Sequence, residues 1–433
     1  MKPLCVISCP IDTFSGYGAR SRDLVKALIK SKDKELDIKI MPKRWGDTPW
    51  NFLSLDDPLR QRMVTQLTTQ PDVWFQITVP NEFQPVGKFN IGVTAGIETD
   101  VFPGEFIEGM NRMNLNLVSS EHSKYVAGHS KYDRLNKEGQ KVAEIKLEKP
   151  CEVLFEGLDL NKYFKNSTLD RSILADVKED FCFLYTGHWL PGSFGEDRKN
   201  TALLIRTFLE TFKGLGKKPA LILKTSQVNY SLIDREQILK HINNIKSKIQ
   251  SDNLPNIYLL HGEMTDEEMN QLNNDPKVKS FVSFTKGEGF GRPLLEAAIT
   301  GKPVITTNWS GHVDFLKPDY NVLVGGELKP VHNSAANKFL IKESKWFNIN
   351  IDIASRAMKD IFKKYKKYFK ESRKQTQYLK ENWSLDKLVE KLNSYLPEPA
   401  QTLSINLPKL KKINKPKQET PKISLPKLKK IEA

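Results

Sequence analysis

Two glutamates stand eight positions apart around a glycine-rich turn, in the run TKGEGFGRPLLE that occupies positions 285–296. A helical pattern opens inside this run, and backbone N–H groups at a helix start can bind a phosphate or a polar sugar. Gly289 and Gly291 let the backbone come close to a ligand. Glu288 lies in the turn and Glu296 lies about 5 Å further along the helix axis. Each carboxylate can therefore hold a pair of vicinal hydroxyls, as on a hexose and on a ribose.

Basic side chains follow two apolar runs in the same half of the chain. Arg198 and Lys199 come after the run at 181–185, and Lys224 ends the next run. Cations at the carboxyl ends of parallel strands stabilise the charge of a departing diphosphate. The chain has no Asp-x-Asp triplet and no His/Cys cluster with zinc spacing, so we expect these cations and helix dipoles to act in place of a metal ion. The P-loop pattern of ordinary kinases and ATPases is also absent.

The pair Glu288 and Glu296 around Gly-Phe-Gly-x-Pro resembles the E-x7-E signature of retaining GT-B glycosyltransferases, family 4 in the sugar-transferase classification. The resemblance covers about residues 1–396 in the order of elements. It implies that Glu288 contacts the donor sugar and that Glu296 holds the ribose. It also implies that the backbone of the turn meets the sugar and the diphosphate, through Gly289, Phe290 and Gly291.

The same resemblance extends to the cations. Arg198 and Lys199 match a basic pair that neutralises the donor diphosphate, and Lys224 resembles the second phosphate-binding lysine of one subgroup. The loop before this pair is longer than usual, and His188 stands where many relatives have arginine. Glu288, Arg198 and Lys199 are thus the expected catalytic residues. For Lys199 taken by itself, an ordinary solvated lysine is the alternative.

Weaker motifs precede helices in the first half of the chain. Gly16 and Gly18 resemble the glycine-rich loop whose backbone approaches the donor, although a tight turn explains them equally well. Glu98 and Asp100 stand where many relatives have a histidine, and they are candidates for acceptor or sugar contact. Local capping of the following helix is their alternative. In the second half, His312 lies in a turn similar to one near the family's cleft, and a structural role is its alternative.

Short apolar runs alternate with amphipathic stretches along the whole chain, which predicts buried parallel strands joined by crossover helices. Six runs in each half predict an α/β protein with two Rossmann-like, doubly wound sheets facing a cleft, the GT-B architecture. The runs are Leu4–Cys9, Asp37–Met41, Val73–Ile77, Ile91–Ala95, Asn116–Ser119, Cys151–Phe155, Phe181–Tyr185, Ala220–Lys224, Asn256–Leu260, Ser280–Phe284, Pro303–Thr306 and Asn321–Val324.

The domain boundaries follow from this pattern. We expect an acceptor domain at 1–165, completed by a C-terminal helix at about 384–396, and a nucleotide-sugar domain at 176–380. Closure is expected about a hinge at Gly157–Val177. The region Ala354–Asn382 is expected to be strongly helical, because it is charged, amphipathic and free of Gly and Pro.

The composition of the chain indicates the compartment in which the protein is expected to work. The 433 residues carry a net charge of +15 and four scattered cysteines, which we interpret as reduced thiols of a cytoplasmic protein without a transmembrane segment. The Lys- and Pro-rich tail at 397–433 carries a duplicated motif, INLPKLKKI and ISLPKLKKI. Its interpretation is either a flexible extension or a docking motif for a nucleic acid or another polyanion.

The predicted activity is transfer of a sugar from a nucleoside-diphosphate sugar, with retention, to an acceptor that the sequence does not identify. The donor is the substrate, of UDP or GDP type, and no cofactor is expected. One alternative is a DNA-modifying glycosyltransferase that acts on a modified base. Others are a non-catalytic nucleic-acid-binding or scaffold protein on a degenerate GT-B fold, and a sugar phosphorylase or epimerase.

Overall fold

The structure is a computed structural model that describes residues 2–46, 48–166 and 172–396. Residues 1–396 belong to one compact unit. The duplicated tail motif and part of the expected hinge lie outside the described residues. No helix in the described ranges is long and apolar enough to cross a membrane.

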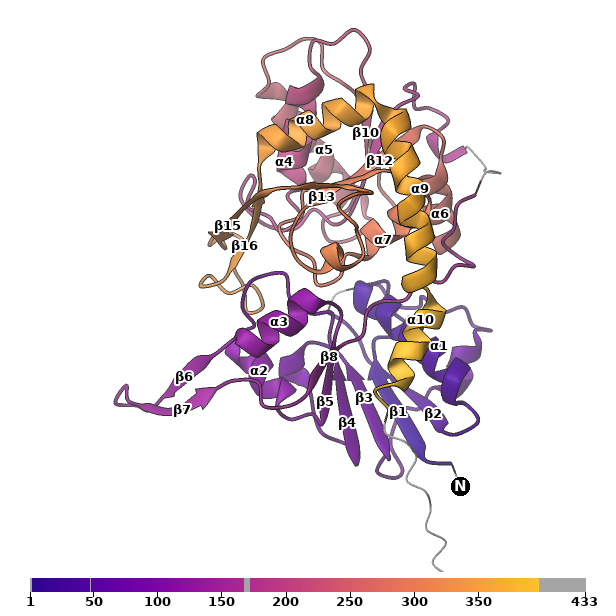
Figure 1. Cartoon of the computed structure of the whole chain (residues 1–433), viewed down its shortest axis with the longest axis vertical. Helices are drawn as coiled ribbons and strands as arrows, with labels where there is room; N and C mark the ends of the chain where they lie inside the picture. The colour runs from indigo at the N-terminus through magenta and orange to yellow at the C-terminus, as the bar shows by residue number, and fades with distance from the viewer. Residues whose placement is uncertain (1, 47, 167–171, 397–433) are drawn as a thin grey trace, which may run out of the picture. The chain divides into compact units, whose positions relative to one another are not determined.

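The first sheet has six parallel strands in the order β2-β1-β3-β4-β5-β8. Most of its residues are buried because helices cover both faces, which is why the strands are short apolar runs. We call this sheet with its helices the first domain (Figure 1). Its strands are β1 (Leu4–Cys9), β2 (Asp37–Pro42), β3 (Val73–Ile77), β4 (Phe89–Val93), β5 (Leu115–Val118) and β8 (Cys151–Val153).

The second sheet repeats this arrangement with the order β11-β10-β9-β12-β13-β14, again all parallel. It forms the second domain with its helices, so the predicted α/β architecture of two doubly wound sheets is confirmed. Each of the twelve predicted runs overlaps a strand. The second sheet consists of β9 (Cys182–Thr186), β10 (Ala220–Lys224), β11 (Ile257–Leu260), β12 (Val278–Val282), β13 (Val304–Thr307) and β14 (Val322–Val324).

Helices begin where the sequence supplies a cap. Ser15 caps the first helix by accepting a hydrogen bond from the N–H of Gly18 at 3.0 Å. Asn200 and Gly291 cap two helices of the second domain in left-handed backbone conformations. The helices are α1 (Gly16–Lys32), α2 (Gly104–Met110), α3 (Glu121–His129), α4 (Thr201–Phe212), α5 (Leu232–Ser247), α6 (Asp266–Asn274), α7 (Arg292–Ile299), α8 (Ile351–Lys363), α9 (Tyr365–Asn382) and α10 (Leu385–Asn393).

The strongly helical region predicted over 354–382 is confirmed, and it is divided at Lys364 into α8 and α9. α8 packs on α4 and the second sheet, whereas α9 runs along α7 (Figure 1). One straight helix could not bury its apolar side against both partners. Ser384 then caps α10, the C-terminal helix that was predicted at about 384–396, and α10 packs against α1 of the first domain.

Two antiparallel hairpins were not expected from the sequence. One joins β6 (Tyr132–Leu135) to β7 (Lys141–Ile145), and the other joins β15 (Gly326–Pro330) to β16 (Lys345–Ile349). β7 and β15 are mostly or wholly exposed, so neither contains the apolar run by which a buried strand is recognised.

Candidate functional site

A cavity of about 630 Å³ lies where the loops that follow the strands of the two sheets meet. This is where open parallel sheets bind ligands. Most of the residues expected at the site line this one cavity. They are Gly16, Glu98, Arg198, Lys199, Lys224, Glu288, Gly289, Phe290, Gly291 and Glu296.

Glu288 is the centre of a buried ion-pair cluster. Its carboxylate accepts a hydrogen bond from Lys199 Nζ at 2.6 Å and another from Arg198 at 3.3 Å. Burial by itself raises the pKa of Glu288, but the charges of Lys199 and Arg198 outweigh it and lower the pKa to about 2. The carboxylate is therefore ionised at any physiological pH.

Loop contacts hold this cluster in place. The N–H of Glu288 donates to Ser310 Oγ at 2.8 Å, and Arg198 also donates to the Gly287 carbonyl at 2.9 Å. On its other side Arg198 lies 3.5 Å from the carboxylate of Glu98 in the first domain. Two cations are thus fixed at the carboxyl ends of β9 and β12, where they can stabilise negative charge that develops on a bound group.

Lys224 ends β10 and extends the cationic side of the cavity. Its Nζ donates to the Gly262 carbonyl at 2.5 Å and lies 4.9 Å from the ring centre of Tyr230. His188, also on this side, is hydrogen-bonded to Ser226 Oγ at 3.1 Å through Nδ1. Burial, together with Lys199 and Lys224, lowers the pKa of His188. At neutral pH His188 is therefore a neutral hydrogen-bonding group.

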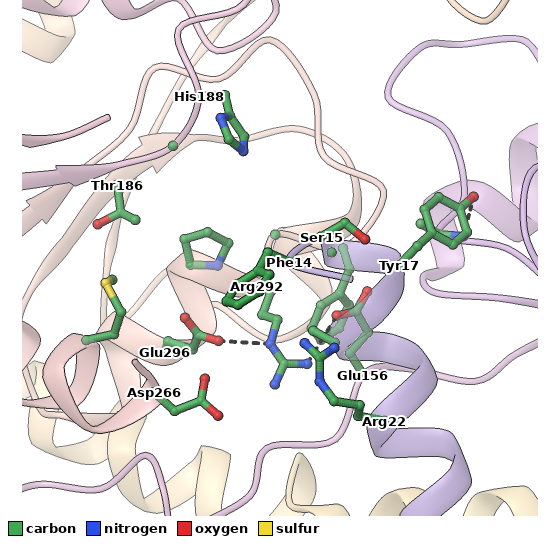
Figure 2. A pocket seen from close by; sticks show the side chains of 18 of the residues that line it. Phe14, Ser15, Tyr17, Arg22, Glu156, Thr186, His188, Asp266, Arg292 and Glu296 are labelled. Carbon is green, nitrogen blue, oxygen red and sulfur yellow. Dashed lines mark hydrogen bonds and ion pairs between the residues drawn. The ribbon is translucent and has the colours of Figure 1, made fainter. Parts of the chain in front are cut away.

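Glu296 is one turn inside α7 and belongs to a second cluster (Figure 2). Its Oε1 accepts a hydrogen bond from Arg292 at 2.8 Å, and Arg292 also pairs with Asp23 and Glu156 of the first domain. Burial raises the pKa of Glu296 to about 7, against the opposing effect of Arg292 and with a further increase from Asp266. Arg292 was not among the expected site residues, although its i, i+4 spacing from Glu296 is the spacing of helical ion pairs.

Gly291 and Gly289 of the turn are needed for two different structural reasons. Gly291 has a φ of +98° and caps α7, a conformation that favours glycine. Gly289 lies against the first domain, because a Cβ on it would stand 1.9 Å from the Ala95 carbonyl oxygen. Ser119 Oγ also donates to the Gly289 carbonyl at 2.9 Å. The absence of a side chain at Gly289 is thus required by the contact between the domains.

Three of the expected residues do not line the cavity. Gly18 faces Thr13, whose carbonyl oxygen would be 2.3 Å from a Cβ there. The Asp100 carboxylate accepts the N–H of Lys345 at 2.6 Å and so joins the first domain to β16. His312 is fully buried and donates through Nε2 to the Thr307 carbonyl at 2.7 Å. Gly18 therefore packs within a turn, Asp100 joins the two domains, and His312 belongs to the core.

Aromatic residues on the first-domain side of the cavity were missed. They come from the β1–α1 loop, from the first turn of α1 and from the loop after β2, and they are Phe14, Tyr17, Trp45 and Phe52. We call these four residues the aromatic wall. A signal was present, because Trp45, Trp50 and Phe52 lie close together in a polar segment just after a predicted strand.

Comparison with known proteins decides the class of this chain. Residues 207–347 match the family model "Glycosyl transferases group 1", and this range includes Lys224, Glu288 and Glu296. The fold of residues 1–396 is that of GT-B enzymes. The chain is a glycosyltransferase with the GT-B fold. None of the curated protein sequences matches it significantly.

The glycosyltransferase is similar in fold to several solved structures. HepE of Anabaena, solved in complex with UDP and glucose, is 11% identical, with a TM-score of 0.57 over 90% of this chain and 98% of that one. A glycosyltransferase of Rickettsia africae is 13% identical, with a TM-score of 0.58 over 91% and 97%. Sucrose-phosphate synthase of Thermosynechococcus elongatus is 10% identical, with a TM-score of 0.57 over 91% and 98%. At these identities the likeness concerns the fold.

Proposed function

We propose that this glycosyltransferase takes a sugar from a nucleoside-diphosphate sugar and transfers it with retention of the anomeric configuration. One observation carries the proposal: Glu288, its two cations and Glu296 line a single cavity that continues to the first domain. Arg198 and Lys199 would face the diphosphate, and Glu288 would face the hydroxyls of the donor sugar. Glu296 would accept from the ribose hydroxyls.

The main catalytic effect in this proposal is electrostatic. When the bond between the anomeric carbon and the diphosphate breaks, negative charge grows on the leaving oxygen. Arg198, Lys199 and Lys224 are already fixed on that side, so they need little reorganisation to stabilise it. Retention follows if the acceptor attacks from the face that the diphosphate leaves. The acceptor hydroxyl then gives its proton to a leaving phosphate oxygen as the new glycosidic bond forms.

The donor is proposed to bind without a cofactor or metal ion, because three cations stand on its diphosphate side. Addition of EDTA should accordingly leave turnover within about twofold of its value without EDTA, and a loss restored by Mg²⁺ or Mn²⁺ would contradict this point.

HepE was solved with UDP, so UDP sugars are the first donors to test and GDP sugars the second. The free cysteines, three of them buried, are compatible with the reducing conditions of the cytoplasm.

The test is release of nucleoside diphosphate from a panel of UDP, GDP, ADP and TDP sugars. We expect one donor class to be consumed, slowly with water as the acceptor. Proton NMR during the first minutes should show the released sugar in the anomeric form of the donor. Release of the opposite anomer would rule out retention, and no release from any donor would rule out the proposed reaction.

The tail at 397–433 is proposed to bind a nucleic acid or another polyanion, on the basis of its nine lysines and duplicated motif. Replacing the lysines of both repeats with glutamine should abolish a gel shift of duplex DNA at low salt. An unchanged shift would assign the binding to the rest of the chain.

A further inference from the structure

The aromatic wall combines two ring pairs, which join the start of α1 and the loop before it to the loop after β2. Phe14 and Phe52 meet edge to face with ring centres 5.1 Å apart, and Tyr17 and Trp45 lie 4.2 Å apart in a tilted pair. The Phe14 side chain is 36% exposed, and the other three are partly buried. Large aromatic side chains left open at the mouth of a polar cavity are typical of a ligand-contacting surface.

The rings line the cavity, and the polar groups beside them are already occupied. Tyr17 Oη is hydrogen-bonded to Thr94 Oγ1 at 2.9 Å and accepts the N–H of Ala95 at 3.2 Å. The guanidinium of Arg22 lies 3.4 Å from the centre of the Phe52 ring and donates to two backbone carbonyls of the β1–α1 loop. These contacts hold Tyr17 and Phe52 of the aromatic wall in place. Figure 2 shows Phe14 and Tyr17 at the first-domain side of the cavity.

The charges on this side do not suit a polyanion. Residues 14–163 contribute five carboxylates and three basic side chains to the cavity. Of the basic ones, Arg22 is held by carbonyls and Lys162 pairs with Asp266, which leaves Lys26. A single-stranded nucleic acid needs a row of cations along its backbone in addition to stacking. The described part of the first-domain side offers ring faces and carboxylates instead.

These features fit the chemistry of a sugar ring. One face of a pyranose presents several C–H groups, whose hydrogens carry partial positive charge and pack well on the negative face of an aromatic ring. The hydroxyls around the edge of the ring can donate to carboxylates. Asp57 and Glu98 line the cavity on the same side as the rings.

We propose that the aromatic wall is the acceptor subsite and that the acceptor is an uncharged saccharide, stacked on Trp45 and Phe14 with its hydroxyls directed toward Asp57 and Glu98. This inference rests on the proposed function, because it needs a donor sugar on the opposite side of the cavity. The saccharide then takes the place of water as the nucleophile. Its hydroxyl forms the glycosidic bond and its proton leaves on the nucleoside diphosphate.

The test measures nucleoside diphosphate release from the active donor while methyl glycosides and disaccharides of glucose, galactose and mannose are added. We expect at least one of them to raise the rate about tenfold or more above hydrolysis. Trp45→Ala should raise the KM for that saccharide by about 5- to 100-fold, the range for loss of one stacking contact. Trp45→Phe should recover most of this loss, since it restores a ring.

The affinity for the free nucleoside diphosphate should change less than twofold in Trp45→Ala, which shows that the fold and the donor side are intact. Trp50→Ala is the matched control, because Trp50 lies in the same loop but does not line the cavity. The proposal is overturned if no saccharide stimulates release while duplex DNA containing 5-hydroxymethylcytosine does. It is also overturned if Trp45→Ala leaves the KM unchanged. Failure of the proposed function looks different: no donor is consumed even by hydrolysis, and both proposals fall.

Discussion

The two sides of the cavity are built from different chemistry. The second-domain side carries fixed charges, with Lys199 and Arg198 paired to Glu288. The first-domain side carries aromatic rings, of which Tyr17 is held through a hydrogen bond of its hydroxyl group. A diphosphate is the same in every donor, so preformed charges suit it. An acceptor differs from one transferase to the next, and loops that carry aromatic rings can change without disturbing the charged side.

Among the substitutions that test this difference between the two sides, Lys199→Ala is expected to reduce activity most. The variant keeps the Arg198–Glu288 ion pair, so the fold should survive, but it removes one cation from the leaving diphosphate. We expect kcat to fall by about 10²- to 10³-fold, the range for loss of one preorganised electrostatic group. Steady-state kinetics measure this, with Lys240→Ala on the exposed surface of α5 as the control. A kcat within threefold of the wild type would remove the charged side from the mechanism.

A smaller loss of activity is expected from Gly289→Ala, which tests whether turnover needs the contact between the two domains. The added methyl group would overlap the Ala95 carbonyl oxygen, so the contact between the domains has to loosen. We expect kcat/KM to fall by about 10- to 100-fold, since a displacement of about 1 Å in a reacting geometry costs about 10²-fold. Gly128→Ala in α3 is the control, because a Cβ there meets no atom within 4 Å. Equal activity of the two variants would show that the observed contact is not needed for turnover.

The smallest expected effect is a change with pH in the free energy of unfolding, caused by a second contact between the domains. Asp314 of the second domain accepts the N–H of Glu121 at the start of α3, at 2.8 Å. Burial raises the pKa of Asp314 to about 6, although that hydrogen bond opposes the shift. The group therefore contributes most to stability below its unfolded pKa, and this contribution is lost as the pH rises through about 6.

Asp314→Asn keeps an oxygen acceptor but does not titrate. The free energy of unfolding of the wild type, relative to Asp314→Asn, should fall by about 1–2 kcal/mol between pH 4 and pH 7. Urea unfolding at four pH values measures this difference. A difference that is constant over the range, or that grows with pH, would mean that the pKa of Asp314 is not raised in the folded protein.

Much of the fold could be predicted because each buried parallel strand is a short, local apolar run. The second-domain side of the site could also be predicted, because Glu288 and Glu296 lie within one loop and helix. Lys224 ends a strand, and Arg198 and Lys199 lie in the loop between a strand and the next helix. Contacts between distant segments could not. The pairing of Arg292 with Asp23 and Glu156 joins three separate parts of the chain, and nothing in the local pattern indicates it.

Local patterns also allow more than one outcome. The glycines of the β1–α1 loop fit a ligand contact or a tight turn, and the structure assigns Gly18 to packing against Thr13. The exposed strand β15 has no apolar run to mark it, and the break at Lys364 depends on which surfaces α8 and α9 cover. The aromatic wall was missed for a different reason, since its residues belong to two distant segments that meet only in the folded protein.

Calorimetric titration with UDP, GDP, ADP and TDP, and with the matching nucleosides, tests the central claim most directly. One nucleoside diphosphate should bind, its nucleoside should bind at least about tenfold more weakly, and Lys199→Ala should remove most of that difference. Binding of diphosphate and nucleoside with equal affinity, or full diphosphate affinity in Lys199→Ala, would contradict the assignment of this cavity to a nucleoside-diphosphate sugar.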